Sequence, residues 1–313
     1  MQDNRINMFQ AGIIFSVSVV LFIAYSILGP LFFKNFYISG TVGEVVPILL
    51  PSLVGIAIFR KNLKASLRLN GFRISDAVLV VIITLFFMPL NLAANAFNMW
   101  LVRIIFGQNI TVEIPVAETG GELIASILVI GLAAAVCEEV LFRGILQGSM
   151  EKLGKAGMFI IVSVLFAAFH FNIEHFLGVF ILSILIGFIV YRTNSLYMGM
   201  LAHFTNNAAA VIISFFANKV PEEIIEQSLM GAESVPGIVE YVILGVIVVF
   251  SSTIAGILIY ALYKNTEGRK AQIELSGRVE SRDIVSFFPG IIIMAGMFLF
   301  TIALYFLYDF PAF

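Results

Sequence analysis

The sequence is poor in charged residues. Only 12% of its 313 residues are Asp, Glu, Lys or Arg, about half the share usual in soluble domains, whereas 60% are hydrophobic and the mean hydropathy is +1.02. With a formal net charge of −2, the chain has neither the basic excess of a nucleic-acid-binding protein nor a solvating acidic tail. The composition therefore predicts a multi-pass membrane protein that binds no nucleic acid and has the lipid bilayer as its surroundings.

Cysteine is nearly absent as well. Cys137 is the one cysteine, which excludes an internal disulfide framework and a metal site built from several cysteines. It lies in an apolar stretch, so we expect an inert small hydrophobe rather than a nucleophile. The chain also lacks internal repeats, low-complexity tracts and anything like a separate soluble domain. We expect a single integral-membrane domain over residues 1–313.

Nine apolar runs are long enough to cross the hydrocarbon region as helices, which takes about 20 residues. They extend over Met8 to Phe33, Val42 to Phe59, Ala77 to Val102, Leu123 to Gly148, Ala156 to Phe171, Phe176 to Tyr191, Leu196 to Ala217, Ile238 to Tyr263 and Ile284 to Tyr308. The sequence thus predicts an all-α fold with nine transmembrane helices. The first run is too long for the core of a signal peptide and is expected to be retained.

Basic residues divide unevenly between the two sides that nine crossings create. Lys34, Arg103 and Lys219 fall on one side, and Arg143 lies within a span. The other fourteen share the opposite side: Arg5, Arg60, Lys61, Lys64, Arg68, Arg73, Lys152, Lys155, Arg192, Lys264, Arg269, Lys270, Arg278 and Arg282. Because Lys and Arg collect on the cytoplasmic side of membranes, we expect a cytoplasmic N-terminus and an external C-terminus. A compact chain without a transit segment fits a prokaryotic plasma membrane.

A few ionisable and amide side chains interrupt the apolar spans. Each ionisable group there costs roughly 3 kcal/mol of insertion free energy, so each needs a partner or a function. These residues fall in the fourth, fifth and seventh spans: Glu138, Glu139, Arg143, His170, His203 and Asn207. Glu139 and Arg143 are four residues apart and share a helix face, whereas Glu138 points about 100° away. The spacing predicts an ion pair between Glu139 and Arg143, with Glu138 free to face the bundle interior.

Helix lengths place Glu138 and His203 at middle depth, reached from the cytoplasmic side, and His170 deeper, which suggests that the fifth span is tilted or starts before Ala156. There, Glu138 could deprotonate a water molecule, while His170 shares that water or protonates a leaving amine. His203 and Asn207 could donate hydrogen bonds to a developing oxyanion, worth about 3 kcal/mol per donor. Alternatively, Glu138, His170 and His203 could bind a catalytic zinc ion that keeps one position open for water. The residues alone leave both chemistries open.

Three short motifs carry a resemblance to a known family. "CEEVLFRG", "FAAFH" and "HFTNN" resemble the EExxxR, FxxxH and HxxxN motifs of the type II CAAX prenyl protease and bacteriocin-processing (CPBP, or Abi) family of intramembrane proteases. The motifs occur in the family's order, and the resemblance covers about Glu122 to Ala217, so we take 122–217 as the catalytic core. The family has about eight helices in its core, so the resemblance does not account for the ninth span.

The resemblance implies an α-helical intramembrane endopeptidase that acts near the cytoplasmic membrane surface. It divides the motif residues into a water-activating pair, an oxyanion-stabilising pair and a supporting pair: Glu138 with His170, His203 with Asn207, and Glu139 with Arg143. The family has been described both as metalloproteases and as metal-independent glutamate proteases, so zinc stays open. Compatible substrates are a prenylated C-terminal CAAX tail, the leader of a bacteriocin or pheromone, and a membrane-anchored regulator.

Two other functions compete with proteolysis. A proton-coupled transporter would relay protons through intramembrane Glu and His residues, but it predicts an inverted repeat with charges in both halves, and neither is seen. A catalytically silent scaffold or regulator of the same family predicts decayed motifs, whereas every motif position is filled here.

Other polar residues in or near the spans are expected to be structural. Glu44 resembles a helix-start charge near the headgroups. Asn91, Asn95 and Asn98 recur on one face of the third span and are expected to form interhelical hydrogen bonds. His175, in the loop after the fifth span, is expected to have an interfacial or capping role.

Overall fold

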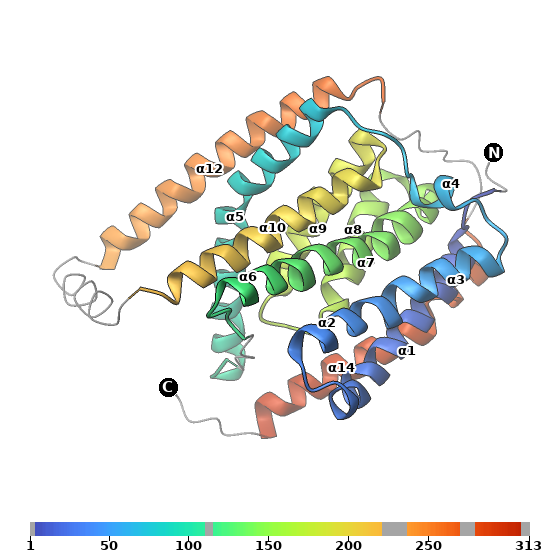
Figure 1. Ribbon diagram of the computed structural model, residues 1–313, viewed down its shortest axis with the longest axis horizontal. Coiled ribbons are helices and arrows are strands. Elements are labelled where there is room, and N and C mark those ends of the chain that lie inside the picture. Colours follow the sequence, from blue (N-terminus) through green and yellow to red (C-terminus); the bar gives the residue numbers. More distant parts are fainter. Residues whose placement is uncertain (1–3, 110–114, 221–236, 270–278, 308–313) are drawn as a thin grey trace.

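A computed structural model describes residues 4–109, 115–220, 237–269 and 279–307. Over these residues the chain is helical without strands, and nine helical segments are long and apolar enough to cross a membrane. The prediction of an all-α, multi-pass membrane protein with nine spans is therefore confirmed for the described part of the chain. Figure 1 shows the helices gathered into one bundle, with α10 and the fourth span near its middle.

Several spans are built from more than one helical element. The first three are α1 (Met8–Phe32), then α2 (Phe36–Glu44), η2 (Val45–Leu49) and α3 (Leu50–Ile58), then α5 (Ile74–Phe106). The fourth joins α6 (Gly120–Ser126), η3 (Ile127–Ala133), α7 (Ala134–Glu139) and η4 (Val140–Gln147). The others are α8 (Gly154–Phe169), α9 (Phe176–Thr193), α10 (Leu196–Ala217), α12 (Gly237–Asn265), and α13 (Ser281–Val285) with α14 (Phe288–Leu307). Short α4 (Leu63–Leu67) lies in a connection, and η5 (Glu151–Leu153) begins the fifth span.

Contacts between connections sort the helix ends into two groups. The backbone N–H of Asn62 donates to the carbonyl of Asn4, and that of Leu196 donates to the carbonyl of Arg68. These bonds bring the N-terminal segment, the 59–73 connection and the 194–195 turn to one end of the bundle, on the right in Figure 1. We call this end the basic end and the other the opposite end.

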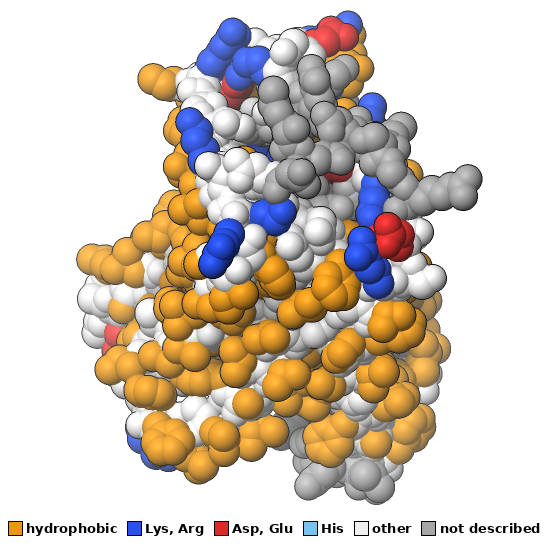
Figure 2. All heavy atoms as spheres, turned by 90° about the vertical axis from the view of Figure 1, so that its right-hand side faces the viewer, with side chains coloured by type: hydrophobic (Ala, Val, Ile, Leu, Met, Phe, Trp, Pro, Cys, Tyr) orange, Lys and Arg blue, Asp and Glu red, His pale blue; other side chains and the backbone are white. Residues whose placement is uncertain are grey.

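Most of the basic residues lie at the basic end, as the count of spans predicts. Those described there are Arg5, Arg60, Lys61, Lys64, Arg68, Arg73, Lys152, Lys155, Arg192, Lys264, Arg269 and Arg282, whereas Lys270 and Arg278 are outside the described residues. Figure 2 looks onto this end and shows Lys and Arg side chains over its upper part, with apolar side chains below them.

Ion pairs hold the connections of the basic end together. Arg68 pairs with Glu151, and Arg5 lies 3.6 Å from the same carboxylate. Burial lowers the pKa of Arg68 to about 10, and the nearby positive charge of Arg5 adds to the effect. Arg68 therefore stays charged at neutral pH, and its pair with Glu151 joins the connection before α5 to the one before α8.

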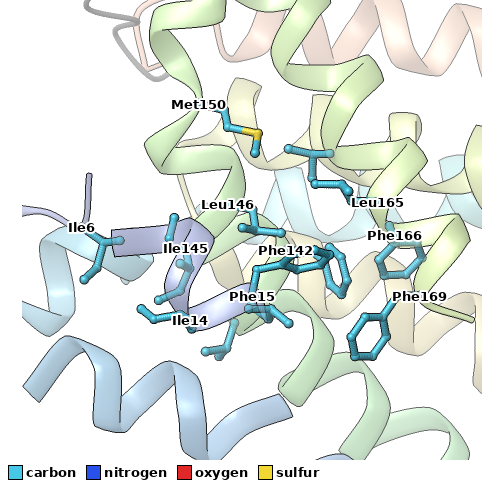
Figure 3. Close-up of a cluster of buried hydrophobic side chains, with 14 of the residues drawn as sticks. Ile6, Ile14, Phe15, Phe142, Ile145, Leu146, Met150, Leu165, Phe166 and Phe169 are labelled. Atoms are coloured by element: carbon cyan, nitrogen blue, oxygen red, sulfur yellow. The ribbon is translucent and has the colours of Figure 1, made fainter. Parts of the chain in front are cut away.

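Phenylalanine rings fill the core between α1, the fourth span and α8. The ring of Phe142 lies 4.9 Å from that of Phe166, 5.5 Å from that of Phe169 and 6.5 Å from that of Phe15 between centroids. Figure 3 shows these four side chains meeting in one cluster. Because aromatic rings bury large apolar areas, the cluster fixes η4 against its neighbours.

The ninth span packs along α1 through small residues. Ser16 donates to the carbonyl of Ser286 at 3.0 Å and accepts from the N–H of Gly290 at 3.1 Å. At the opposite end, the Tyr305 hydroxyl donates to Glu174 at 2.8 Å. The ninth span therefore supports both α1 and the loop that follows α8.

The close approach at Gly290 yields a stability prediction. A Cβ there would lie 3.1 Å from the Ser16 Cα, whereas one at Gly296 of the same helix would meet no described atom within 4 Å. Gly290→Leu should lower the free energy of unfolding by about 1–3 kcal/mol, the usual cost of overpacking. Gly296→Leu, the matched control, should not. Thermal unfolding in detergent checks this, and equal losses in both variants would contradict the packing.

Candidate active site

The predicted ion pair between Glu139 and Arg143 lies at the centre of the site. Arg143 Nη1 donates to Glu139 Oε1 at 2.8 Å, and neither side chain is exposed. Arg143 Nη2 also donates to the hydroxyl and the carbonyl of Ser183 on α9, at 2.9 and 3.1 Å. The pair thereby neutralises a buried arginine and ties the fourth span to the sixth.

Glu138 points away from that pair, as its place in the α-helical turn of α7 requires. Its side chain lines a cavity of about 420 Å³. Its Oε2 atom is buried and has no hydrogen-bond partner among the described residues. The nearest described cationic or imidazole nitrogen is His170 Nε2, at 3.9 Å. Glu138 is therefore a buried carboxylate that faces an open space.

His170 ends α8 and turns one ring nitrogen toward Glu138. Its Nδ1 lies 2.8 Å from the carbonyl of Phe166, which can only accept a hydrogen bond, so Nδ1 carries the proton. The Nε2 atom is then free to accept a proton or a hydrogen bond on the cavity side. At 3.9 Å, Nε2 and the Glu138 oxygen are too far apart for a direct hydrogen bond, but one water molecule can bond to both.

His203 has a different partner from the one expected. It was expected in one group with Glu138, and both side chains do line the same cavity, but its Nδ1 lies 3.0 Å from Glu139 Oε1. Because Gly199 lies one turn earlier on α10, α10 approaches the Glu139 side of α7: a Cβ at Gly199 would come 3.1 Å from Glu139 Oε2. Glu139 therefore binds both Arg143 and His203, and the Nε2 atom of His203 is left to the cavity that the ring lines.

Asn207 lies one helical turn beyond His203 and also lines the cavity. One of its amide N–H groups donates to the carbonyl of Ile130 at 3.0 Å, and its oxygen accepts from Asn206 at 3.1 Å. These two bonds set the orientation of the amide. The second N–H group of the amide takes part in neither of them. Asn206, which the sequence reasoning did not single out, lines the same cavity, and the doubled Asn in "HFTNN" was its only signal.

Phe166 is a second residue that the sequence reasoning passed over. It opens the FxxxH motif, and its ring lies 4.3 Å from the Arg143 guanidinium carbon. Ring centroids place it 4.9 Å from His170 and 5.9 Å from His203. Phe166 therefore forms an apolar wall shared by the ion pair and both histidines, and its stacking on Arg143 adds a cation–π contact.

The asparagines of α5 divide between structure and cavity. Asn95 accepts from the N–H of Gly178 on α9 at 3.1 Å, which confirms its expected interhelical role, whereas Asn98 donates to the carbonyl of Ile173 in the connection before α9 at 2.6 Å. Asn91 and Asn95 also line the cavity, together with Ser126 of α6. Asn91 Oδ1 and Ser126 Oγ are buried without hydrogen-bond partners in the described parts of the chain. Two residues that line the cavity thus carry buried polar atoms without described partners.

The expectation for Glu44 is wrong. Asn35 caps α2 by accepting hydrogen bonds from the N–H groups of Tyr37 and Ile38, so the second span begins at Phe36 rather than Val42. Glu44 therefore lies within the span, just before the π-helical segment η2 that packs against α7. Its Oε2 is buried with no hydrogen-bond partner in the described residues.

The direction in which the cavity opens also differs from the expectation of access at the basic end. From Glu138 the lining continues to Pro115, Val116 and Ala117 in the connection before α6, and to Ser214 near the end of α10. These residues lie at the opposite end, and Val116 and Ser214 are exposed. Toward the basic end, the side chains that follow Glu138 in the fourth span are buried. The cavity therefore opens at the opposite end of the bundle.

The proposed zinc ligands do not fit a metal site in this arrangement. Within the described residues, no group of three or more His, Cys, Asp or Glu side chains is placed to hold a metal ion. We therefore derive the chemistry of the site from its own side chains.

Comparison with known proteins agrees with the motifs. Residues 120–209 match the family model described as Rce1-like, Type II CAAX prenyl endopeptidase Rce1-like. No curated protein and no solved structure matches the chain. The matched segment contains all three motifs, so the family resemblance predicted from them is confirmed. At the level of the family, the match supports a CAAX-type endopeptidase within the membrane.

The two neighbouring glutamates should respond differently to loss of charge. Glu139→Gln leaves the buried Arg143 without its counter-ion and should lower the free energy of unfolding by about 3–5 kcal/mol. Glu138→Gln replaces an unpaired buried carboxylate by a neutral group of the same shape, so stability should stay the same or rise. Thermal unfolding of both variants in detergent measures the difference, and a similar change in the two would contradict the division of roles.

Proposed function

We propose that the chain is an intramembrane endopeptidase in which Glu138 and His170 activate water to hydrolyse a peptide bond. The observation that carries the proposal is the pairing of these two groups across 3.9 Å at the cavity wall, with Glu138 Oε2 unpartnered among the described residues. Burying an unpaired carboxylate costs free energy, so its presence indicates a function. A general base that is linked to a histidine through one water molecule is such a function.

The proton balance of the reaction needs only these groups. The water oxygen bonds to the carbonyl carbon of the substrate while Glu138 takes one of its protons. As the C–N bond breaks, the same proton passes to the leaving amine, directly or through His170, and the Glu138 carboxylate is restored. His170 can take part because its Nδ1 proton is held by the carbonyl of Phe166, which keeps Nε2 on the cavity side.

Oxyanion stabilisation falls to Asn207 and His203. The second amide N–H group of Asn207 is not used by the bond to Ile130 and can donate to the oxyanion. His203 can donate from Nε2 only when its ring carries both protons, since Nδ1 already donates to Glu139. Glu139 and Arg143 therefore hold His203 in position without touching the reacting atoms.

Substrate contacts are proposed for the part of the cavity wall that α5 and α6 contribute. Asn91 and Ser126 present an amide oxygen and a hydroxyl that lack partners in the described structure. A peptide main chain carries both donors and acceptors, so it can satisfy both groups where an apolar ligand cannot. We propose that a peptide segment enters between this wall and the histidines, and that its scissile carbonyl lies near Glu138. A prenylated tail and a leader peptide both supply such a segment.

The catalytic pair gives the direct test of function. Glu138→Gln and His170→Ala, each reconstituted in proteoliposomes with a peptide library, should lose cleavage by about 10²–10⁴-fold, because each removes a group from the proton-transfer path. Glu280→Gln, at an exposed carboxylate of the basic end, is the matched control and should cleave like the wild type. Mass spectrometry of the products measures the rates.

Retained cleavage in both cavity variants would exclude the proposed mechanism. Absence of cleavage by the wild-type protein under conditions where it is folded would favour the scaffold or regulator instead. A transporter is disfavoured because the intramembrane charges that the structure describes at the site gather around one cavity and are tied to one another.

Chelation separates the two chemistries that the motifs left open. Because the proposed proton path uses a carboxylate and an imidazole, cleavage should be unchanged after dialysis against EDTA or 1,10-phenanthroline. Rates before and after chelation, and after addition of Zn²⁺, provide the measurement. Loss of activity that Zn²⁺ restores would show that a metal takes part and would overturn the proposed path.

A further inference from the structure

The cavity and the basic residues lie at opposite ends of the bundle. Twelve described Lys and Arg residues gather at the basic end, whereas Lys34, Arg103 and Lys219 are the described basic residues of the opposite end. Because positive charge collects on the cytoplasmic side, this distribution directs the basic end to the cytoplasm. The cavity, which reaches the surface at Val116 and Ser214, then faces the other side of the membrane.

The basic end is closed above the site. Arg143 and Gln147 follow Glu138 on the fourth span and donate to Ser183 and to the carbonyl of Gly187 on α9. Both donors are buried, and the intervening Leu141, Phe142, Ile145 and Leu146 are at most 1% exposed. A Cβ at Gly187 would come 3.0 Å from the Gln147 side chain, so the two helices are in close contact. No lining residue of the cavity lies beyond Glu138 toward this end in the described fourth span.

At the opposite end, residues of two connections line the opening of the cavity, which we call the mouth. Three consecutive residues of the connection before α6, Pro115 to Ala117, line the cavity there, and His175 does so from the connection after α8. The ammonium group of Lys219, just after α10, donates to the carbonyl of Glu118 at 3.1 Å. This bond joins two sides of the opening outside the membrane-spanning helices, so the rim is built from connections rather than from helix faces.

We infer that the active-site cavity opens to the extracytoplasmic side of the membrane and that the substrate is a peptide segment exposed there. A prenylated C-terminal tail resides on the cytoplasmic leaflet, where the basic end blocks its approach to Glu138. An exported peptide that carries a leader, or an external segment of a membrane protein, reaches the mouth directly. The substrate part of the inference rests on the proposed function, whereas the direction of opening does not.

Cysteine accessibility tests the direction without any need for activity. Cys137 is buried and unpaired, so a Cys137→Ala chain provides a background without thiols. Ser214→Cys places a thiol at the mouth, and Ser75→Cys places one of the same size at the exposed start of α5 on the basic end. A membrane-impermeant maleimide is added to intact bacterial spheroplasts that express each variant, and then to lysed ones.

The Ser214→Cys protein should be labelled in intact spheroplasts, and the Ser75→Cys protein only after lysis. Val116→Cys, also exposed at the mouth, repeats the measurement at an independent position. Labelling of either mouth variant only after lysis, together with labelling of the Ser75→Cys protein in intact spheroplasts, would overturn the inference. So would labelling of all variants from the same side.

Cleavage in oriented vesicles tests the substrate part separately. A peptide library added outside should be cleaved by right-side-out vesicles and at least tenfold less by inverted vesicles of equal protein content. Cleavage only in inverted vesicles would overturn the extracytoplasmic assignment. Cleavage in neither orientation, with Ser214→Cys labelled from outside, would exclude the proposed proteolytic function and still support the direction in which the cavity opens.

Discussion

A guanidinium group enclosed within a membrane-spanning bundle must be neutralised, and this requirement organises the centre of the molecule. Arg143 is completely buried and takes its counter-ion from Glu139, one turn earlier on the same helix. Its Nη2 atom donates to Ser183 of α9, its flat face lies on Phe166 of α8, and Glu139 in turn holds His203 of α10. Four spans therefore meet around one charge pair, and the catalytic candidates are placed by the same contacts that satisfy Arg143.

Local periodicity and charge counts were enough to predict much of this arrangement. The nine spans follow from apolar runs of sufficient length, and the common location of the basic connections follows from an odd number of crossings. Helical geometry separates Glu138 from Glu139 and pairs the latter with Arg143, because positions four apart share a face while adjacent ones do not. These features depend only on sequence spacing within one helix. The motifs add the family, which the match over residues 120–209 supports.

What depends on the approach of separate helices was not predictable. His203 was expected beside Glu138, but the closeness of α10 to the Glu139 side, at Gly199, is a property of packing. Glu44 was misplaced because one side chain, Asn35, starts the helix earlier than hydropathy indicates. The direction of the cavity is set by which helix ends are closed by side chains and which by connections. Counting residues along a single span gives the depth of Glu138 but says nothing of the side on which space remains.

The proposed attack on a peptide carbonyl restricts the conformation in which a polypeptide can be cut beside Glu138. Within an α-helix, each carbonyl is already bonded to the amide four residues further along the chain and is shielded from attack. A protein segment must therefore be unwound before its backbone lies against the catalytic groups. Helical stability at the cleavage point, more than side-chain identity, would then decide which membrane-associated chains are cut.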